Sequence, residues 1–291
     1  MDVGLILRDL KRTRQVEDRP FRLAGYYPTS GKRSTGADAV CIDLEDGVSF
    51  ADKDQARSAA IDLFLTRANT RAEVSLRIND PKTDLGQRDL EALCAAEVCP
   101  DAVMLPKCDS PEEVRDVSHA LSSISSTLPL IVMAETARGG AAAEAIATAS
   151  PNVSAMFFGA IDYAADIGCA VEWDAVVFAR SRVVVAAAIA NVSPIDSPFM
   201  NVSALDELED ECSRTQALGF VGKAAIHPTQ VSTVQQAFTP AATDVAWAKL
   251  IIEAYETNNG GVLLVDGKLI ERPVIASAKR TLALASTVEE D

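Results

Sequence analysis

The sequences LPLIVMAETARGG, residues 128–140, and VSAMFFGAIDYAADIG, residues 153–168, together decide the fold. Each contains a short apolar run, Leu130–Ala134 in the first and Val153–Phe158 in the second. The Ala-rich segment 139–149 between the runs has helical composition. An apolar run, a helix and a second apolar run are typical of a βαβ unit, which predicts a parallel sheet.

An acidic residue follows each of these apolar runs. Glu135 comes directly after the first run, and Asp162 comes after the second run and the segment 159–161. In a parallel sheet both carboxylates would lie at the carboxyl ends of neighbouring strands, where ligands bind. Two carboxylates with room for water and substrate oxygens suit one Mg²⁺ ion. The alternative is that each acid caps the following helix; the pair favours a metal site.

Strand-like and helix-like runs alternate along most of the chain. Eight candidate strands lie at 22–26, 39–43, 73–78, 102–105, 130–134, 153–158, 194–197 and 222–225. Six candidate helices lie at 52–65, 85–96, 111–122, 141–148, 173–190 and 204–218. The pattern predicts a (β/α)₈ TIM barrel over residues 1–238, with 1–20 as an N-terminal segment. A doubly wound sheet is the alternative, but no GxGxxG follows any strand.

The segment 239–291 differs from what precedes it, because the alternation stops beyond residue 230. It contains helical stretches at 242–255 and 276–285 around the extended sequence VLLVDG. Its short apolar segments need a surface to pack on. We therefore expect a C-terminal helical arm that contacts a neighbouring subunit.

Composition limits the possible functions. The 291 residues are 48% apolar, enough for one large domain with an appendage, and the net charge is −15. That charge argues against binding to nucleic acid or to an anionic membrane. The first fifteen residues are too charged for a secretory signal, no apolar run is long enough to span a membrane, and the six cysteines show no CxxC pair. We expect a cytoplasmic protein whose cysteines are reduced core thiols.

Further charged residues follow the other predicted strands. Asp43, Glu45 and Asp46 follow the second strand, where three acids repel one another unless a cation lies among them. The alternative is an acidic cluster at the next helix N-terminus. Arg77 lies on the apolar third strand and must meet an anion, either one of these acids or a substrate carboxylate. Lys107 follows the fourth strand. His227, next to a proline, is expected to have a structural or helix-capping role.

These motifs carry a family resemblance. The order ADAVCIDLEDGVSFADKDQAR, LRIN, MLPK, MAET, FFGAIDYAADIG, SPF and GFVGKAAIHPTQV, over residues 22–238, resembles the HpcH/HpaI aldolase and citrate lyase beta-subunit family. The resemblance implies an Mg²⁺-dependent barrel that assembles as a homotrimer or homohexamer. It also implies a carbon–carbon lyase that converts citryl, malyl or citramalyl thioesters into an acetyl thioester and a 2-keto acid, or the reverse. A thioester hydrolase, a keto-acid aldolase and a non-catalytic subunit are the alternatives, and the acyl carrier could be coenzyme A or an acyl-carrier protein.

The resemblance also assigns roles to residues. It implies that Glu135 and Asp162 bind the metal and that Arg77 holds the keto-acid carboxylate. The other implied site residues are Glu45 and Asp46 near the metal, Arg22, Gly159 and Ala160 as substrate contacts, Lys107 toward acidic groups or coenzyme A phosphates, and Glu271 as an acid/base group reaching a neighbouring site. Two features depart from the family pattern. The segment 28–36 is shorter than usual, and Glu271 stands where relatives usually carry aspartate.

Overall fold

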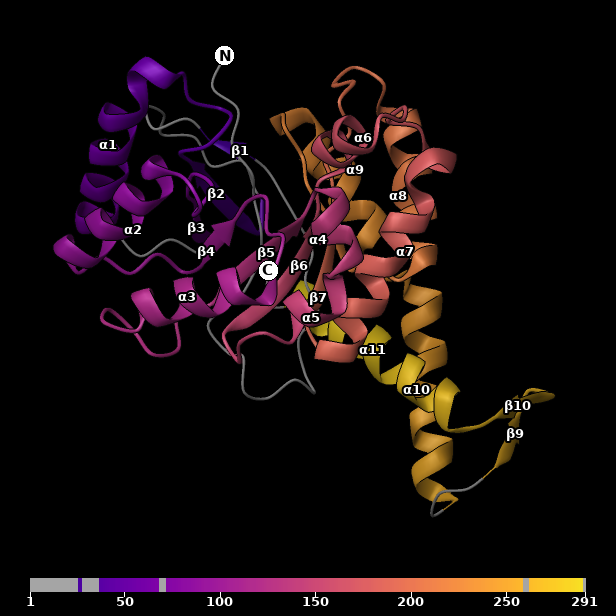
Figure 1. Cartoon of the computed structure of the whole chain (residues 1–291). Helices are drawn as coiled ribbons and strands as arrows, with labels where there is room; N and C mark the ends of the chain where they lie inside the picture. Colours follow the sequence, from indigo (N-terminus) through magenta and orange to yellow (C-terminus); the bar gives the residue numbers. More distant parts are fainter. Residues whose placement is uncertain (1–25, 28–36, 68–71, 259–261, 290–291) are drawn as a thin grey trace.

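The computed structural model describes residues 26–27, 37–67, 72–258 and 262–289 (Figure 1). Eight parallel strands form one sheet in sequence order, each paired with the next along the chain. Their bounds are β1 Tyr26–Tyr27, β2 Ala39–Asp43, β3 Glu73–Arg77, β4 Val103–Leu105, β5 Leu130–Ala134, β6 Val153–Phe158, β7 Ser193–Asp196 and β8 Gly222–Lys223. The predicted α/β class is confirmed. The pairings among described residues do not include one between β8 and β1, so barrel closure stays a prediction.

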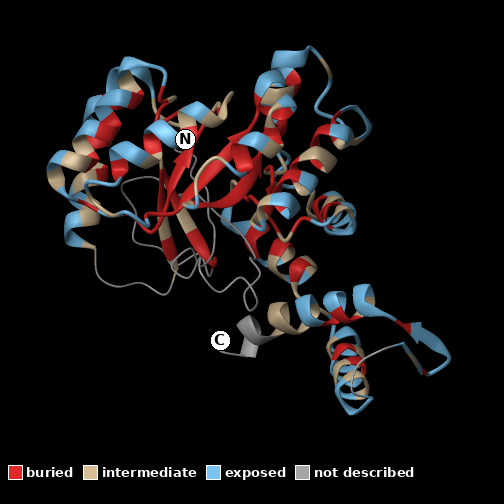
Figure 2. Ribbon diagram, turned by 60° about the horizontal axis from the view of Figure 1, so that its bottom comes forward, coloured by how far each residue is buried: buried red, intermediate tan, exposed pale blue. Residues whose placement is uncertain are grey.

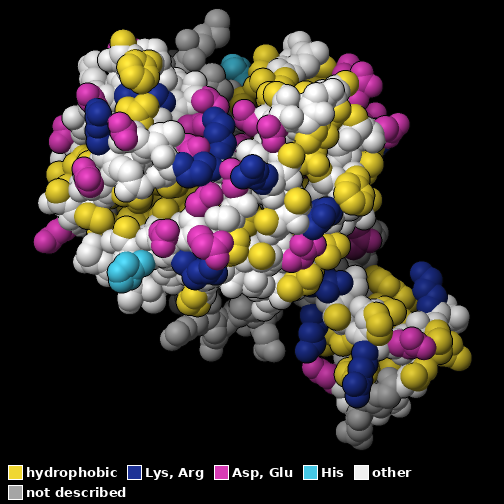
Figure 3. Space-filling view, in the orientation of Figure 1, with side chains coloured by type: hydrophobic (Ala, Val, Ile, Leu, Met, Phe, Trp, Pro, Cys, Tyr) yellow, Lys and Arg dark blue, Asp and Glu magenta, His cyan; other side chains and the backbone are white. Residues whose placement is uncertain are grey.

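Helices cover the outside of the sheet, and the strands lie in the middle of the molecule (Figure 2). The helices are α1 Lys53–Thr66, α2 Asp84–Ala96, α3 Pro111–Leu121, α4 Ala137–Ala141, α5 Ala143–Ala147, α6 Ala160–Ile167, α7 Trp173–Ala190, α8 Leu205–Leu218 and α9 Pro228–Phe238. Every residue of β5 and of β6 is buried, which explains why these strands are continuous apolar runs. On the face shown in Figure 3, Lys and Arg side chains lie among Asp and Glu side chains near the middle of the sheet region.

The helix predictions differ from the structure at three places. The predicted helix 141–148 contains α5 but only the last residue of α4, and Ala142 leaves the helical conformation between the two. The helix α6 was not predicted; its eight residues are too few to show clear periodicity. The helix α9 was also missed, because the alternation continues past residue 230. His227 caps α9, since its ring nitrogen accepts from the N–H of Thr229, which confirms its predicted capping role.

The arm projects away from the rest of the molecule (Figure 1). It consists of α10 Ala242–Thr257, the antiparallel pair β9 Leu263–Val265 and β10 Lys268–Ile270, and α11 Arg272–Glu289. Asp266 and Gly267 between the two strands both have positive φ, as a tight hairpin turn requires. The arm has a small core of its own, made of Ala248, Ile251, Val265, Ile270, Ile275 and Ala278. None of the helices in the described segments has both the length and the apolarity needed to cross a bilayer.

The six cysteines form no disulfide among the described residues, as expected. Cys41, Cys108 and Cys212 are buried. The prediction that they are core thiols is wrong for Cys99, which is exposed, and only partly right for Cys94 and Cys169, which are half-buried.

Candidate active site

The first ion pair of the candidate site joins Asp43, at the carboxyl end of β2, to Arg77, at the carboxyl end of β3. They are the last residues of their strands and lie opposite one another in the ladder. Arg77 donates from Nε and Nη2 to the two carboxylate oxygens of Asp43, both at 2.7 Å, and its Nη1 lies 2.9 Å from Glu45 Oε2. Burial alone would raise the pKa of Asp43, but the guanidinium holds it below its ordinary value. The prediction that Arg77 meets an anion is confirmed with these two acids.

Lys107 joins the β4 end of the site to the acids after β2. Its ammonium group donates to Glu45 and, at 3.2 Å, to Asp46. Burial would lower the pKa of Lys107, but the Glu45 and Asp46 carboxylates raise it above its ordinary value. The expected cation among the crowded acids is therefore present, in the form of Lys107 and Arg77. Asp43 and Glu45 are therefore held in buried ion pairs and do not form an unpaired acidic cluster at the next helix N-terminus, whereas the side chain of Asp46 is 59% exposed.

A third cation, Lys53 of α1, holds the backbone of the same loop. Its ammonium donates to the carbonyls of Leu44 and Glu45 and to Asn79 Oδ1, each at 2.7 Å. Asp89 of α2 in turn accepts from the backbone and side-chain nitrogens of Asn79 at 2.8 and 2.6 Å. Sequence reasoning assigned these residues no role. The available signal was that Lys53 belongs to the DLEDGV…DK motif and that Asn79 closes the LRIN motif.

Glu135 follows β5 and is the most deeply buried acid of the site, with 1% exposure. Its Oε1 accepts from the backbone N–H of Lys107 at 2.7 Å. Burial raises the pKa of Glu135 to about 8; Arg77 opposes this shift, whereas the charges of Glu45 and Asp162 add to it. A buried carboxylate next to two others needs a compensating positive charge before it ionises fully at neutral pH.

The surroundings of Glu135 exclude the helix-cap alternative for this residue. The cap of α4 is the next residue, Thr136, whose hydroxyl accepts from the N–H of Gly139 at 2.9 Å. Glu135 instead lies against Gly159, where a Cβ atom would come closer than 3.0 Å to Glu135 Cβ and Oε2. A glycine is therefore needed after β6 for Glu135 to keep its position.

Asp162 lies in the first turn of α6, four residues beyond the end of β6. The N-cap of α6 is Gly159, so Asp162 is not the cap, although a carboxylate in a first turn is favourable. Asp162 is half-buried and close enough to Glu135 to raise its pKa. Within the described residues no group of three or more His, Cys, Asp or Glu side chains could hold a metal. Glu135 and Asp162 are a fitting pair for a hard divalent cation that takes its other ligands from water and substrate.

Of the other predicted site residues, Glu271 lies elsewhere in its own chain, and Arg22 cannot be placed. Glu271 is exposed in the arm, where its carbonyl accepts the first hydrogen bonds of α11. Arg22 and the shortened segment 28–36 lie outside the described residues. Gly159 and Ala160 do lie at the site, between β6 and Asp162. The roles of these residues stay predictions.

A second buried ionic cluster lies at the carboxyl ends of β7 and β8. Lys223 is fully buried and donates to Asp196 Oδ2 and to the carbonyl of Ser197, both at 2.7 Å, and to Glu211 Oε1 at 2.5 Å. Arg180 of α7 adds a bond from Nε to Asp196 Oδ1 at 2.8 Å. Two cations balance two acids, so this cluster ties β7 and β8 to the helices α7 and α8.

Comparison with known proteins identifies the family. The model of the HpcH/HpaI aldolase/citrate lyase family matches residues 29–228, and that of a carbon–carbon bond lyase of the TIM-barrel fold matches residues 174–288. The chain belongs to the HpcH/HpaI aldolase/citrate lyase family. The predicted family is thus confirmed, and so is the prediction of an enzyme of the carbon–carbon lyase type.

Individual members of the HpcH/HpaI aldolase/citrate lyase family differ in their named activities. Mouse mitochondrial citramalyl-CoA lyase is 30% identical over 93% of this chain and 88% of its own length. A (3S)-malyl-CoA thioesterase of Cereibacter sphaeroides is 31% identical over 92% of this chain and 96% of its own length. The structure of CitE from Mycobacterium tuberculosis with magnesium, acetoacetate and coenzyme A has a TM-score of 0.75 and 29% identity, over 93% of this chain and 99% of that one.

Proposed function

We propose that this chain is an Mg²⁺-dependent lyase that cleaves or forms the carbon–carbon bond of a 3-hydroxy-acyl thioester. The observation that carries the proposal is the buried Glu135, whose pKa the nearby Asp162 helps to raise to about 8 and which interacts with Arg77, the partner of Asp43. Glu135 and Asp162 would hold the cation. When bound, the cation would polarise the substrate oxygens and stabilise the negative charge that develops as the bond breaks. The magnesium in the solved CitE complex supports this assignment.

Arg77 would bind the carboxylate of the 2-keto acid fragment. Asp43 occupies Nε and Nη2, which fixes the plane of the guanidinium, and Nη1 is left toward Glu45. A substrate carboxylate would therefore share Nη1 with Glu45 or replace Glu45 there. Lys107 would keep Glu45 and Asp46 in place when this exchange happens, because its ammonium group contacts both. Gly159 and Ala160, which join β6 to Asp162, would contact the substrate next to the metal.

As the bond breaks, the substrate hydroxyl loses its proton to become the keto group, and the acetyl thioester fragment leaves as an enolate that must gain a proton at carbon. We assign this proton to Glu271 of a neighbouring subunit. Glu271 is exposed at the start of α11, in an arm that projects from its own chain. The outer face of the β9–β10 hairpin carries the paired residues Leu264 and Leu269, which are 70% and 55% exposed and would be covered by a second subunit. A homotrimer or homohexamer with arms exchanged between subunits accounts for both features.

The substrate class is tested with purified protein and Mg²⁺ against malyl-, citramalyl- and citryl-coenzyme A. A lyase releases a 2-keto acid without a free thiol, whereas a hydrolase releases free coenzyme A thiol. The thioesterase among the relatives makes the second outcome the main competing one. Glu135→Ala should abolish either activity. If the protein turns over none of these three substrates but accepts a thioester of an acyl-carrier protein, the carrier changes and the proposed reaction stands. If no thioester yields a keto acid, the proposal is refuted.

The role of the arm is tested by mixing two inactive variants. Glu271→Gln should keep Mg²⁺ binding but lower turnover by about 10²–10⁴-fold, the range expected for loss of a general acid. Mixing it with Glu135→Ala protein should restore part of the activity, because some sites in hybrid oligomers combine an intact metal centre with an intact arm. Wild-type turnover in Glu271→Gln, or a fully active monomer, would refute the arm assignment.

A further inference from the structure

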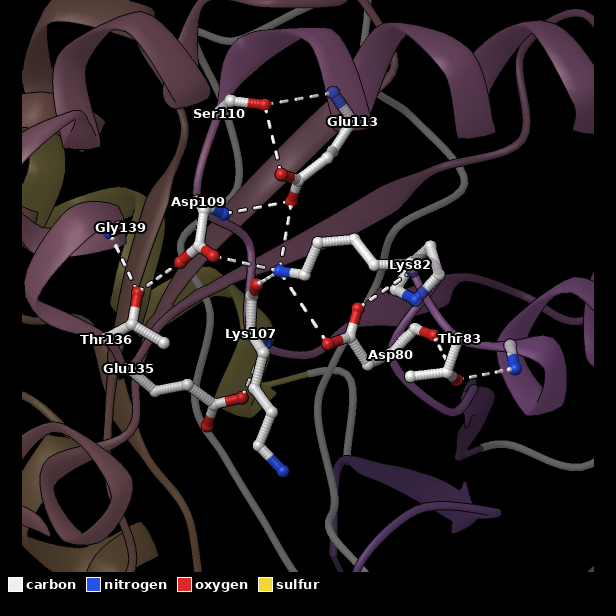
Figure 4. Close-up of polar contacts among 12 residues, drawn as sticks. Asp80, Lys82, Thr83, Lys107, Asp109, Ser110, Glu113, Glu135, Thr136 and Gly139 are labelled. Atoms are coloured by element: carbon white, nitrogen blue, oxygen red, sulfur yellow. Dashed lines mark hydrogen bonds and ion pairs between the residues drawn. The ribbon is translucent and has the colours of Figure 1, made fainter. Parts of the chain in front are cut away.

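Lys82 lies beside the candidate metal site without belonging to it. It is located between β3 and α2, its side chain is 37% exposed, and its ammonium group points into the segment that follows β4 (Figure 4). The ammonium donates to the backbone carbonyl of Lys107 at 2.5 Å and to Asp109 Oδ2 at 3.0 Å. Asp80 and Glu113 complete its surroundings at 3.7 and 3.5 Å.

The hydrogen bond from Lys82 to the Lys107 carbonyl affects Glu135 through the backbone of Lys107. The N–H of Lys107 is the backbone donor to Glu135 Oε1, at 2.7 Å. Lys107 makes this bond from a left-handed conformation, with φ of 50°. That conformation costs a residue with a Cβ about 1–2 kcal/mol, so it persists only where neighbouring contacts hold it. Lys82 supplies such a contact at the carbonyl of the same residue.

A second connection from Lys82 also ends beside Glu135. Asp109, held by Lys82 at one carboxylate oxygen, accepts from the Thr136 hydroxyl at 2.5 Å with the other. Thr136 follows Glu135 in the chain and caps α4 (Figure 4). Lys82 therefore contacts Lys107, whose N–H donates to Glu135. Through Asp109 it also holds Thr136, which follows Glu135 in the chain. Without the ammonium group, Asp80, Asp109 and Glu113 would repel one another, and both connections would loosen.

We propose that Lys82 is a positioning residue for the cation site, which holds the Glu135 carboxylate in place through the Lys107 backbone and through Asp109 and Thr136. The inference rests on the proposed function only in taking Glu135 as a metal ligand. Residues that orient metal ligands typically change metal affinity about 10–100-fold when removed. Lys82 need not touch the substrate for this effect.

The test is calorimetric titration of Mg²⁺ into the full-length protein, together with thermal unfolding. Lys82→Met should weaken Mg²⁺ binding about tenfold or more. Lys82→Arg should recover much of the affinity, because a guanidinium can donate to both the Lys107 carbonyl and Asp109. Lys249→Met, which removes an exposed lysine of α10, is the matched control and should bind Mg²⁺ like the wild type. If Lys82→Met does not fold, Asp109→Asn weakens the same ammonium contact and should lower the affinity several-fold.

The outcomes separate this inference from the proposed function. If the wild type binds Mg²⁺ and Glu135→Ala does not, but Lys82→Met binds within twofold of the wild type, the role of Lys82 is refuted alone. A lower unfolding temperature with unchanged Mg²⁺ affinity would also refute it, because Lys82 would then only stabilise the fold. A wild type that takes up no Mg²⁺, or a Glu135→Ala protein that binds it fully, would refute the metal site and the inference together.

Discussion

Replacing Gly159 with alanine tests the geometry of the site most directly. Gly159 has φ of −98°, a conformation open to alanine, so the new methyl group would act only through its volume. That methyl would lie closer than 3.0 Å to Cβ and Oε2 of Glu135 and 3.3 Å from its Cδ. Carbon atoms in contact are normally about 3.5–4.0 Å apart, so the two residues must separate by more than about 0.5 Å. A rotamer change cannot remove the clash at Cβ, because that atom is attached to the backbone after β5.

The expected cost has two parts. Overpacking a buried site destabilises by about 1–3 kcal/mol, which should lower the unfolding temperature by several degrees. Displacement of a ligating carboxylate should weaken Mg²⁺ binding by about 10–100-fold, and a reacting centre moved by about 1 Å loses about a hundredfold in turnover. Gly159→Ala should therefore lose metal affinity and kcat together.

Gly168→Ala is the matched control at the other end of α6. Gly168 has φ of 74° and nothing within 4 Å of the position that a Cβ would take. Alanine there should destabilise the protein by about 1–2 kcal/mol through backbone strain without changing Mg²⁺ affinity. The measurement is calorimetric Mg²⁺ titration and thermal unfolding of both variants. Mg²⁺ affinity in Gly159→Ala within twofold of the wild type would show that Glu135 is not a ligand or can bind from another position.

Four further predictions follow from the charges. Because Mg²⁺ binds the ionised carboxylate and the pKa of Glu135 is about 8, Mg²⁺ affinity should rise about tenfold per pH unit up to about pH 8 and then level off, as titrations from pH 6 to 9 would show. Because the pKa of Glu135 is higher in the folded state, protonation of Glu135 favours folding. Without metal, the free energy of unfolding of the wild type relative to that of Glu135→Gln should therefore decrease as the pH rises from about 4.5 to 8. A difference that does not change with pH would contradict this. Arg77→Lys should lower kcat/KM by about a hundredfold or more, since lysine cannot donate two parallel bonds to Asp43; a change in unfolding temperature alone would make Arg77 purely structural. Lys223→Met leaves Asp196 buried with less compensation and should cost about 3–5 kcal/mol in denaturant unfolding, with Mg²⁺ affinity unchanged.

The sequence predicted the sheet accurately because buried parallel strands are local signals. The runs 39–43, 130–134 and 153–158 coincide with β2, β5 and β6. Short helices were harder, since α6 and α5 have too few turns for a periodicity to be counted. The site acids were found because a strand end places polar residues at a predictable edge, although the helix α6 that carries Asp162 was not predicted.

The sequence by itself determined the α/β class, the order of strands, the acids after β5 and β6, and, through its motifs, the family. These follow from apolar runs, composition and spacing, which act over a few residues. The tertiary structure decided which side chains meet: Lys53 with the carbonyls of Leu44 and Glu45, Lys82 with the carbonyl of Lys107, and Gly159 with Glu135. Each of these contacts except the first joins residues on different strand ends, and all depend on a backbone atom or on empty space next to a glycine. Apart from the motif that contains Lys53, such contacts leave no pattern in a single sequence, because any residue provides a carbonyl and the reason for a glycine appears only when its neighbour is in place.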